Sequence, residues 1–381
     1  MANAKSKWRR LRWVTSMYKE DRIVENFRTI SDIFPYNRIQ RDGKVFEFDR
    51  QLHELPNEFT YRGEKTDIHD LLKDTWTTGF LVIKDDTIRF EEYYLGNAED
   101  TLNITWSAGK SVVSALVGIA IEEGLIDGVD CIVSDLAPEL KGSGYEGIRL
   151  KDVLQMSSGI GFNEDYRSFF SDINRMGRTI ALGRSLNDFA CSLKAERKPG
   201  TFCHYVSMDT QVLGMVLQAV TGRSLSEYLE EKIWKKLGME SDARWLVDDT
   251  GMELAFGTLN AVLRDYARFG RLYLLGGNWD GQQIVPKSWV EDSMRMDGPH
   301  LLPGKHDHCD FAPGYGYQWW IPEKPQGDFY ACGIQGQYIY VHPSKNVVIV
   351  KTSADPNWTA NSENNPKVME MMQYLANHLD E

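Results

Sequence analysis

The sequence lacks the cysteine pattern of a disulfide-stapled protein. Its 381 residues include five cysteines, an odd number. They are scattered without a pair spacing, at Cys131, Cys191, Cys203, Cys309 and Cys332. Disulfide scaffolds carry even numbers of cysteines, whereas cytosolic proteins keep their thiols reduced. The sequence therefore predicts reduced thiols and a cytoplasmic protein.

The sequence also lacks an apolar run long enough to cross a membrane. The longest, at 112–121, is broken by Ser114 and Gly118, and a membrane helix needs about 20 apolar residues. Five basic residues near the N-terminus look like the charged start of an export signal: Lys5, Lys7, Arg9, Arg10 and Arg12. The segment VTSMYKED at 14–21 follows them and is not apolar, so neither a signal peptide nor a membrane partner is expected.

An excess of positive charge is absent as well. The chain has 43 lysines and arginines against 55 aspartates and glutamates, a formal net charge of −12. Such a surface repels phosphate backbones, so we expect no nucleic-acid partner. Internal repeats and low-complexity tracts are missing too, which excludes repeat architectures. The 42% of hydrophobic residues is instead typical of a globular chain, and a length of 381 residues suggests two or three domains or lobes, or one large domain with insertions.

The predicted elements divide the chain into three parts. Residues 1–75 are polar and mixed, and are interpreted as an arm that wraps around the rest. A sheet domain is expected from 76–124 and 326–381, and a mainly helical lobe from 125–325. The patterns behind this division are a β-hairpin at 80–94, helices at 107–123, 210–220, 224–237, 259–275 and 366–379, and strands at 328–334, 337–342 and 347–352. We therefore predict an α/β (α+β) fold, in which an antiparallel sheet built from both chain ends is flanked by helices and the lobe is inserted.

The motif Ser107-Ala108-Gly109-Lys110 begins the first predicted helix. Three residues along a helix place two side chains on one face, so the lysine amine can reach the serine hydroxyl. A serine becomes a nucleophile when a neighbouring base takes its proton, and the free N–H groups at a helix start can stabilise an oxyanion. Because S-x-x-K often occurs by chance, the alternative is a capping serine beside a solvated lysine.

Two distant segments strengthen the catalytic interpretation. Tyr205-Val206-Ser207 precedes a predicted helix, and the segment CGIQGQ at 332–337 interrupts the C-terminal strands with two glycines. Glycines in a strand permit close approach of a ligand to the backbone. Taken singly, the tyrosine is better interpreted as a half-buried core residue and the glycines as a bulge.

Together these motifs resemble the serine β-lactamase and penicillin-binding superfamily, most closely its class C-related branch. That branch also holds esterases, D-aminopeptidases and 6-aminohexanoate-dimer hydrolases. Further matches are LQMSSG at 154–159, LGM at 237–239 and RDYARFG at 264–270. Within the branch, Y-x-S combined with C-G-I-x-G-Q is most similar to the 6-aminohexanoate-dimer hydrolases and esterases. The resemblance implies a β-lactamase-like fold and a serine hydrolase without metal or organic cofactor.

The resemblance also implies roles for single residues. Ser107 is the expected acylating nucleophile, and Lys110 and Tyr205 are the expected coupled base and acid. The backbone N–H groups of Ser107 and Ile334 are expected to form the oxyanion hole. Four further residues are candidate substrate contacts: Tyr166, Ser207, Trp320 and Gly333. The acids Glu164 and Asp165 are weaker candidates, for binding a substrate ammonium.

Two departures from the family pattern bear on the substrate. Ala331 stands where lactamases place a lysine or histidine that faces the β-lactam carboxylate, and Ser207 replaces the asparagine of Y-x-N. Both favour small neutral esters or linear amides. A β-lactamase or D-aminopeptidase activity, or a catalytically weak ligand-binding protein, remains as an alternative. The sequence leaves open the acyl group and the leaving group of the substrate. It also leaves open whether Lys110 or Tyr205 is the base in the resting enzyme. The oligomeric state is open too, and a homodimer is one option.

Two other motifs are weaker. Gly109-Lys110-Ser111 is similar to the end of a phosphate-binding loop, but position 104 is isoleucine where that loop needs glycine. His306, His308 and Cys309, with His300 nearby, offer zinc donors on a spacing that matches no familiar zinc site. Neither a metal nor a cofactor is expected.

Overall fold

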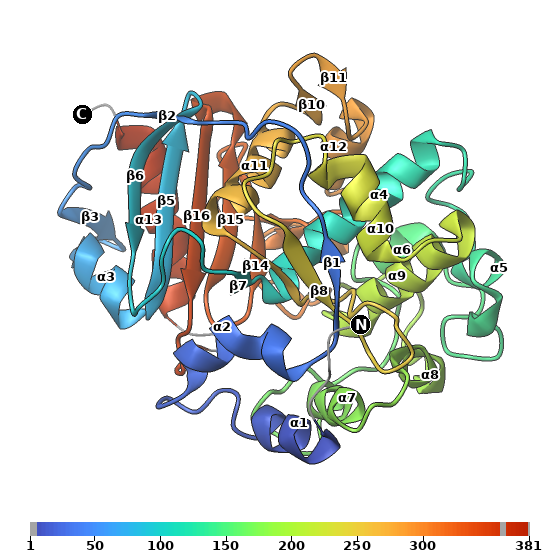
Figure 1. The fold of residues 1–381 in the computed structure, drawn as a ribbon. Helices are drawn as coiled ribbons and strands as arrows, with labels where there is room; N and C mark the ends of the chain where they lie inside the picture. The colour runs from blue at the N-terminus through green and yellow to red at the C-terminus, as the bar shows by residue number, and fades with distance from the viewer. Residues whose placement is uncertain (1–5, 359–362, 380–381) are drawn as a thin grey trace.

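The computed structural model describes residues 6–358 and 363–379, so Lys5 of the basic N-terminal cluster lies outside it. An eight-stranded sheet joins the two ends of the chain (Figure 1). Its order is β12 (Gly314–Tyr315), β13 (Trp320–Ile321), β14 (Phe329–Gly333), β15 (Gln337–His342), β16 (Val347–Ser353), β5 (Thr77–Lys84), β6 (Thr87–Tyr93) and β2 (Asp49–Arg50). All neighbours are antiparallel except β2 and β6. The predicted antiparallel sheet from both chain ends is confirmed.

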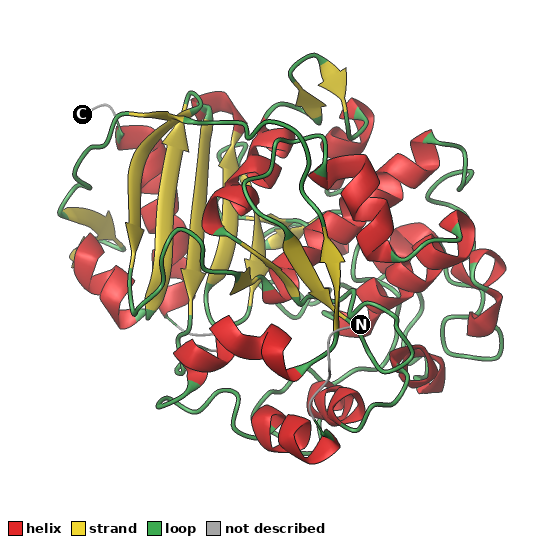
Figure 2. Cartoon of the chain, in the orientation of Figure 1, coloured by secondary structure: helices red, strands yellow, loops and turns green. Residues whose placement is uncertain are grey.

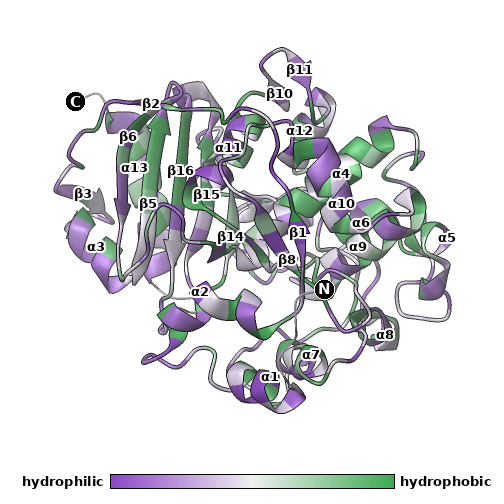
Figure 3. Ribbon diagram, in the orientation of Figure 1, coloured by the Kyte–Doolittle hydropathy of each residue, from purple (hydrophilic) through white to green (hydrophobic). Residues whose placement is uncertain are grey.

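Helices cover both faces of this sheet (Figure 2). Alternate residues of β5 enter two cores: Leu81 and Ile83 pack in the core that includes α11 (Leu263–Leu274), and Phe80 and Val82 in the core that includes α13 (Asn364–His378). A strand buried on both faces is apolar throughout rather than alternating, as Figure 3 shows for the central strands.

A second sheet of four strands was not predicted. Its order is β1 (Tyr36–Ile39), β8 (Ala243–Leu246), β9 (Leu259–Ala261) and β7 (Asn103–Ile104). The helix predicted at 259–275 was wrong at its start, because residues 259–261 form β9 and α11 begins at Leu263. Strands of two to four residues are too short to show a periodicity of their own.

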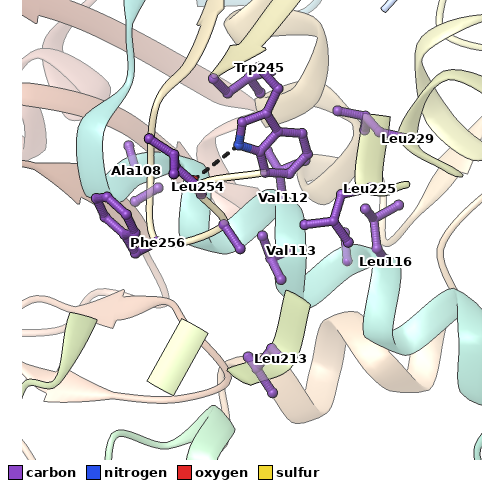
Figure 4. Packing of buried hydrophobic residues seen from close by; sticks show 14 of the residues in the cluster. Ala108, Val112, Val113, Leu116, Leu213, Leu225, Leu229, Trp245, Leu254 and Phe256 are labelled. Carbon is purple, nitrogen blue, oxygen red and sulfur yellow. Dashed lines mark hydrogen bonds between the residues drawn. The ribbon is translucent and has the colours of Figure 1, made fainter. Parts of the chain in front are cut away.

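The helical part of the chain centres on α4 (Lys110–Glu122) and α9 (Ser207–Thr221), which pack against each other. Figure 4 shows the apolar core beside α4, where the Trp245 indole N–H donates to the Leu254 carbonyl at 3.2 Å. The same N–H donates to the Gly257 carbonyl at 3.0 Å. These bonds fix the loop 254–257 beside the start of α4.

The other elements complete the described chain. The pattern at 224–237 forms α10 (Leu225–Leu229) followed by a π-helical turn, η3 (Glu230–Trp234). The remaining helices and strands are α1 (Lys7–Val14), α2 (Ile23–Ile33), α3 (Ile68–Asp74), α5 (Val133–Leu136), α6 (Leu150–Leu154), α7 (Asp172–Ala181), α8 (Leu186–Ser192), α12 (Lys287–Ser293), β3 (Glu58–Tyr61), β4 (Glu64–Asp67), β10 (Asn278–Trp279) and β11 (Gln282–Gln283). The division into arm, sheet domain and lobe stays a prediction. Among the described helices, none combines the length and apolar character that a membrane span requires.

Candidate active site

The S-x-x-K motif lies where a 3₁₀ turn, η1 (Trp106–Gly109), runs into α4. The Lys110 amine donates to the Ser107 hydroxyl at 3.0 Å. The lysine is only 1% exposed, and burial lowers its pKa to about 7. Removal from water disfavours the charged ammonium, so a large share of the amine is neutral near pH 7. A neutral amine at this distance can accept the serine proton.

Two further acceptors fix the direction of the Lys110 side chain. Its amine donates to the Phe256 carbonyl at 2.5 Å and to the Ser207 hydroxyl at 3.4 Å. Phe256 belongs to the loop that Trp245 holds, and Ser207 begins α9. An amine has three hydrogen-bonding positions, and these contacts together with Ser107 occupy all of them. The Lys110 amine is therefore held in place by three separate segments of the chain.

Tyr205 lies beside both residues of the motif. The nearby Ser107 side chain acts to lower the pKa of its phenol, and the Lys110 amine lies 5.2 Å from the centre of its ring. Burial raises the pKa of Tyr205 well above its usual value. The Trp320 ring stacks on the Tyr205 ring, with centroids 5.5 Å apart and planes 19° apart. Burial thus favours a neutral phenol at rest next to a lysine that loses its proton readily.

The end of β14 approaches η1 so closely that only glycine fits at position 333. A Cβ there would lie 2.2 Å from the Thr105 carbonyl oxygen. This approach brings Ile334 to the cavity that Ser107 also lines, which has a volume of about 480 Å³. Within the described residues, neither the Ser107 nor the Ile334 N–H has a backbone or side-chain acceptor. Two such donors on one cavity have the properties of an oxyanion hole.

Glu164 is a buried acid next to this constellation. Its Oε1 accepts the Ser207 N–H at 2.8 Å, and its buried Oε2 has no partner among the described residues. Burial raises the pKa of Glu164, while the nearby Lys110 amine opposes that rise. Conversely, the carboxylate raises the pKa of Lys110. The sequence singled Glu164 out only for a substrate ammonium, and no motif indicated a contact with the Lys110 network.

A sequence model of the family described as Beta-lactamase matches residues 68–370. The chain belongs to the β-lactamase family. It is 33% identical over 300 residues to the 6-aminohexanoate-dimer hydrolase of Paenarthrobacter ureafaciens, covering 76% of each chain.

Solved structures agree with this membership. A Bacillus anthracis protein described as a candidate 6-aminohexanoate-dimer hydrolase superposes with a TM-score of 0.85, at 26% identity, over 96% of both chains. A family VIII carboxylesterase has a TM-score of 0.61 at 15% identity, over 80% of this chain and 95% of that one, and it shows the shared fold alone. The resemblance stated from the motifs is confirmed, and with it the assignment to serine hydrolases acting on esters or amides.

The candidate substrate contacts of this family member do not share one place. Tyr166 lines the cavity, with its ring edge-on to Tyr18 at 6.2 Å. Ser207, Trp320 and Gly333 are not among the described residues that line it. Lys110 and Tyr205 do not line it either, and the three residues contact these groups or η1: Ser207 accepts from Lys110, Trp320 stacks on Tyr205, and Gly333 permits the approach of β14.

Two further acids, Asp165 and Asp209, and the histidine motif are bonded to other groups of the protein. Asp165 accepts from the Arg167 side chain at 3.2 Å at the surface. Asp209 is buried, accepts from Tyr145 at 2.9 Å and from Ser158 at 2.8 Å, and its pKa rises to about 8 through burial. His306 donates to the Leu302 carbonyl at 2.8 Å. In the described segments, no three His, Cys, Asp or Glu side chains gather in a way that could hold a metal ion.

Proposed function

We propose that this β-lactamase-family serine hydrolase transfers the acyl group of an ester or a linear amide to water through Ser107. One observation carries the residue assignment. The Ser107 hydroxyl accepts a hydrogen bond from the Lys110 amine and lies near Tyr205, and the cavity is lined by Ser107 and Ile334, whose N–H groups have no acceptor among the described residues. Nucleophile, base, acid and oxyanion donors are thus all within reach of one carbonyl carbon.

The acylation step follows from the order of proton affinities. Lys110, with its pKa near 7, takes the Ser107 proton while Oγ attacks the carbonyl carbon. The N–H groups of Ser107 and Ile334 stabilise the tetrahedral oxyanion. Collapse of the intermediate breaks the bond to the leaving group, and the neutral Tyr205 hydroxyl gives that group its proton.

Deacylation uses the same pair of groups. The Lys110 ammonium first returns its proton to the Tyr205 phenolate, whose pKa is the higher, and the neutral amine then takes a proton from the water that attacks the acyl carbonyl. The bond to Ser107 breaks, and the serine oxygen regains its proton from Lys110. Ser107, Lys110 and Tyr205 have all regained their starting protonation states after one turnover, so no metal or cofactor is needed to complete the cycle.

The test is a panel of p-nitrophenyl esters, linear ω-amino-acid amides and D-amino-acid amides, measured on the wild type and on Ser107→Ala. We expect turnover that the substitution abolishes, and labelling of Ser107 by a fluorophosphonate. Retained turnover in Ser107→Ala would refute the assignment. A binding protein would remain unlabelled, and fast nitrocefin hydrolysis would favour the β-lactamase alternative despite Ala331.

For the cellular setting we infer the cytoplasm. The five cysteines are all unpaired, which suits a reducing compartment. Cell fractionation with an antibody against the chain tests this. Detection of the protein in the periplasmic or extracellular fraction would overturn this inference. The oligomeric state is open, with a homodimer as one option, and light scattering measures it.

A further inference from the structure

The cavity beside Ser107 is a pocket with a mostly apolar wall. Its volume of about 480 Å³ falls in the range of pockets that hold small organic ligands, about 300–1,000 Å³. Ile173, Met176 and Ile180 of α7 form one side, and Phe256 and Ile334 lie near the serine. An apolar pocket of this size gains affinity from each methylene group that it removes from water.

The N-terminal segment supplies another part of the pocket wall. Trp13, Met17, Ile30 and Phe34 all line it, and all precede residue 68, where the family match begins. Trp13 and Phe34 pack edge to face at 5.4 Å. The segment is held by the body of the protein, because α1 packs against α7. The wall is therefore a fixed surface, and it lies outside the part of the chain that the family match covers.

The charges of the wall select against a cationic substrate. The polar residues that line the pocket include Lys19, Arg167 and Arg178 but, among the described residues, no aspartate or glutamate. The Arg178 guanidinium lies 4.1 Å from the centre of the Phe169 ring. Arg167 is paired with Asp165 at 3.2 Å, and the buried Glu164 acts electrostatically on the lining residues Tyr18 and Tyr166, so the excess positive charge of the lining comes from Lys19 and Arg178. A substrate ammonium beside those two side chains would meet like charges, whereas an uncharged or anionic end would not.

We propose that the substrate carries an extended apolar group, with an uncharged or anionic far end, and that the N-terminal segment forms half of its binding site. This inference rests on the proposed hydrolase function. It predicts a preference different from that for a 6-aminohexanoate dimer, whose amine end is cationic. The structure thus assigns specificity to α1, α2 and α7 rather than to the reacting residues.

A series of p-nitrophenyl esters from acetate to octanoate tests chain length. We expect kcat/KM to rise about fourfold for each added methylene until the pocket is filled, from about 0.8 kcal/mol per methylene. Hexanoyl and adipoyl esters should both exceed the 6-aminohexanoyl ester. A flat series, or a preference for the 6-aminohexanoyl ester, overturns the inference.

A variant locates the effect in the pocket. Gly177 lines the cavity on α7, and its nearest neighbour for a Cβ is Val14 at 3.5 Å. Gly177→Leu fills the space between the two walls while favouring the helix. We expect it to reduce the octanoate-to-acetate ratio of kcat/KM at least tenfold. Thr179→Leu, outside the cavity on the same helix, is the matched control and should leave that ratio unchanged. Equal ratios in both variants would contradict the proposed binding site.

Binding without turnover separates the two proposals. Calorimetry on Ser107→Ala should show octanoate binding at least 100-fold more tightly than acetate, and 6-aminohexanoate binding no better than acetate. Failure of this order overturns the apolar pocket even if the wild type is an active hydrolase. Another outcome is a wild type that binds the ligands in the expected order of affinity but neither hydrolyses esters or amides nor reacts with a fluorophosphonate. That result supports the apolar pocket and refutes the hydrolase mechanism.

Discussion

Gly333→Ala should disable the oxyanion hole without touching a reacting side chain. Its Cβ would lie 2.2 Å from the Thr105 carbonyl oxygen and 3.1 Å from the Trp106 Cβ. Ordinary contact begins at 3.4 Å, so the end of β14 and η1 must separate by the difference, about 1.2 Å. The N–H of Ile334 follows Gly333 directly and moves with it. Misplacement by about 1 Å costs about 100-fold, and loss of one oxyanion donor about 10²–10³-fold in kcat.

The assay is steady-state hydrolysis of a p-nitrophenyl ester, with thermal denaturation to measure the folded fraction. We expect kcat to fall about 100-fold and KM to change little, because most of the cavity wall stays in place. Gly124→Ala is the control. Gly124 lies beyond the end of α4 with φ of 70° and no atom near its Cβ position, so the substitution introduces backbone strain away from the site. A folded Gly333→Ala protein with kcat within about threefold of the wild type would refute this reasoning.

Three further predictions concern proton balance. The value of kcat/KM should fall as the pH drops below about 7, because Lys110 becomes charged there. Glu164→Gln should shift this fall to lower pH, because the substitution removes a charge that raises the pKa of Lys110. An unchanged pH profile would exclude an electrostatic coupling between Glu164 and Lys110. Tyr205→Phe should lower kcat by about 10²–10⁴-fold at an unchanged melting temperature, and full activity would mean that another group protonates the leaving group. Lys351 is 1% exposed, and burial lowers its pKa to about 7 in the folded protein. In the unfolded chain the same lysine binds a proton below its usual pKa of about 10.5, so the free energy of unfolding decreases as the pH falls from about 10.5 to 7. Lys351→Met should therefore add about 1–3 kcal/mol at pH 7 and flatten this slope in urea denaturation, and a destabilised variant would contradict the argument.

The elements that the sequence predicted well are those with a strong local pattern. The hairpin expected at 80–94 matches β5 and β6, and the C-terminal strands match β14, β15 and β16 within two residues at each end. Their runs of β-branched and aromatic residues are long enough to carry a signal and are bounded by turn residues. The second sheet has no such signal, because its strands are two to four residues long and two of its three strand pairs join residues more than a hundred positions apart.

For the candidate site, too, the sequence indicated only the residues that belong to a local motif. The order of motifs indicated Ser107, Lys110 and Tyr205, since family motifs are written in the sequence. The contacts of Glu164 and the carbonyl of Phe256 with the Lys110 network were not predictable, because a loop contributes them through tertiary packing alone. The apolar pocket wall was missed for a similar reason: residues 1–75 are polar on average, and the few apolar side chains that face the cavity are diluted among charged ones.

Lys110 shows that burial of a helix can itself indicate chemistry. Of residues 112–121, all but Ser114 and Gly118 are apolar, on every side of the helix rather than along one stripe. Such a helix is buried all round, and the structure buries α4 continuously from Lys110 to Ala120. A lysine in its first turn must leave water with it, and its pKa then falls toward the range that a base needs near pH 7. A lysine on an amphipathic surface helix would instead extend its charge into solvent. The apolar run after the motif therefore distinguishes a catalytic S-x-x-K from a chance one more sharply than the four residues of the motif do.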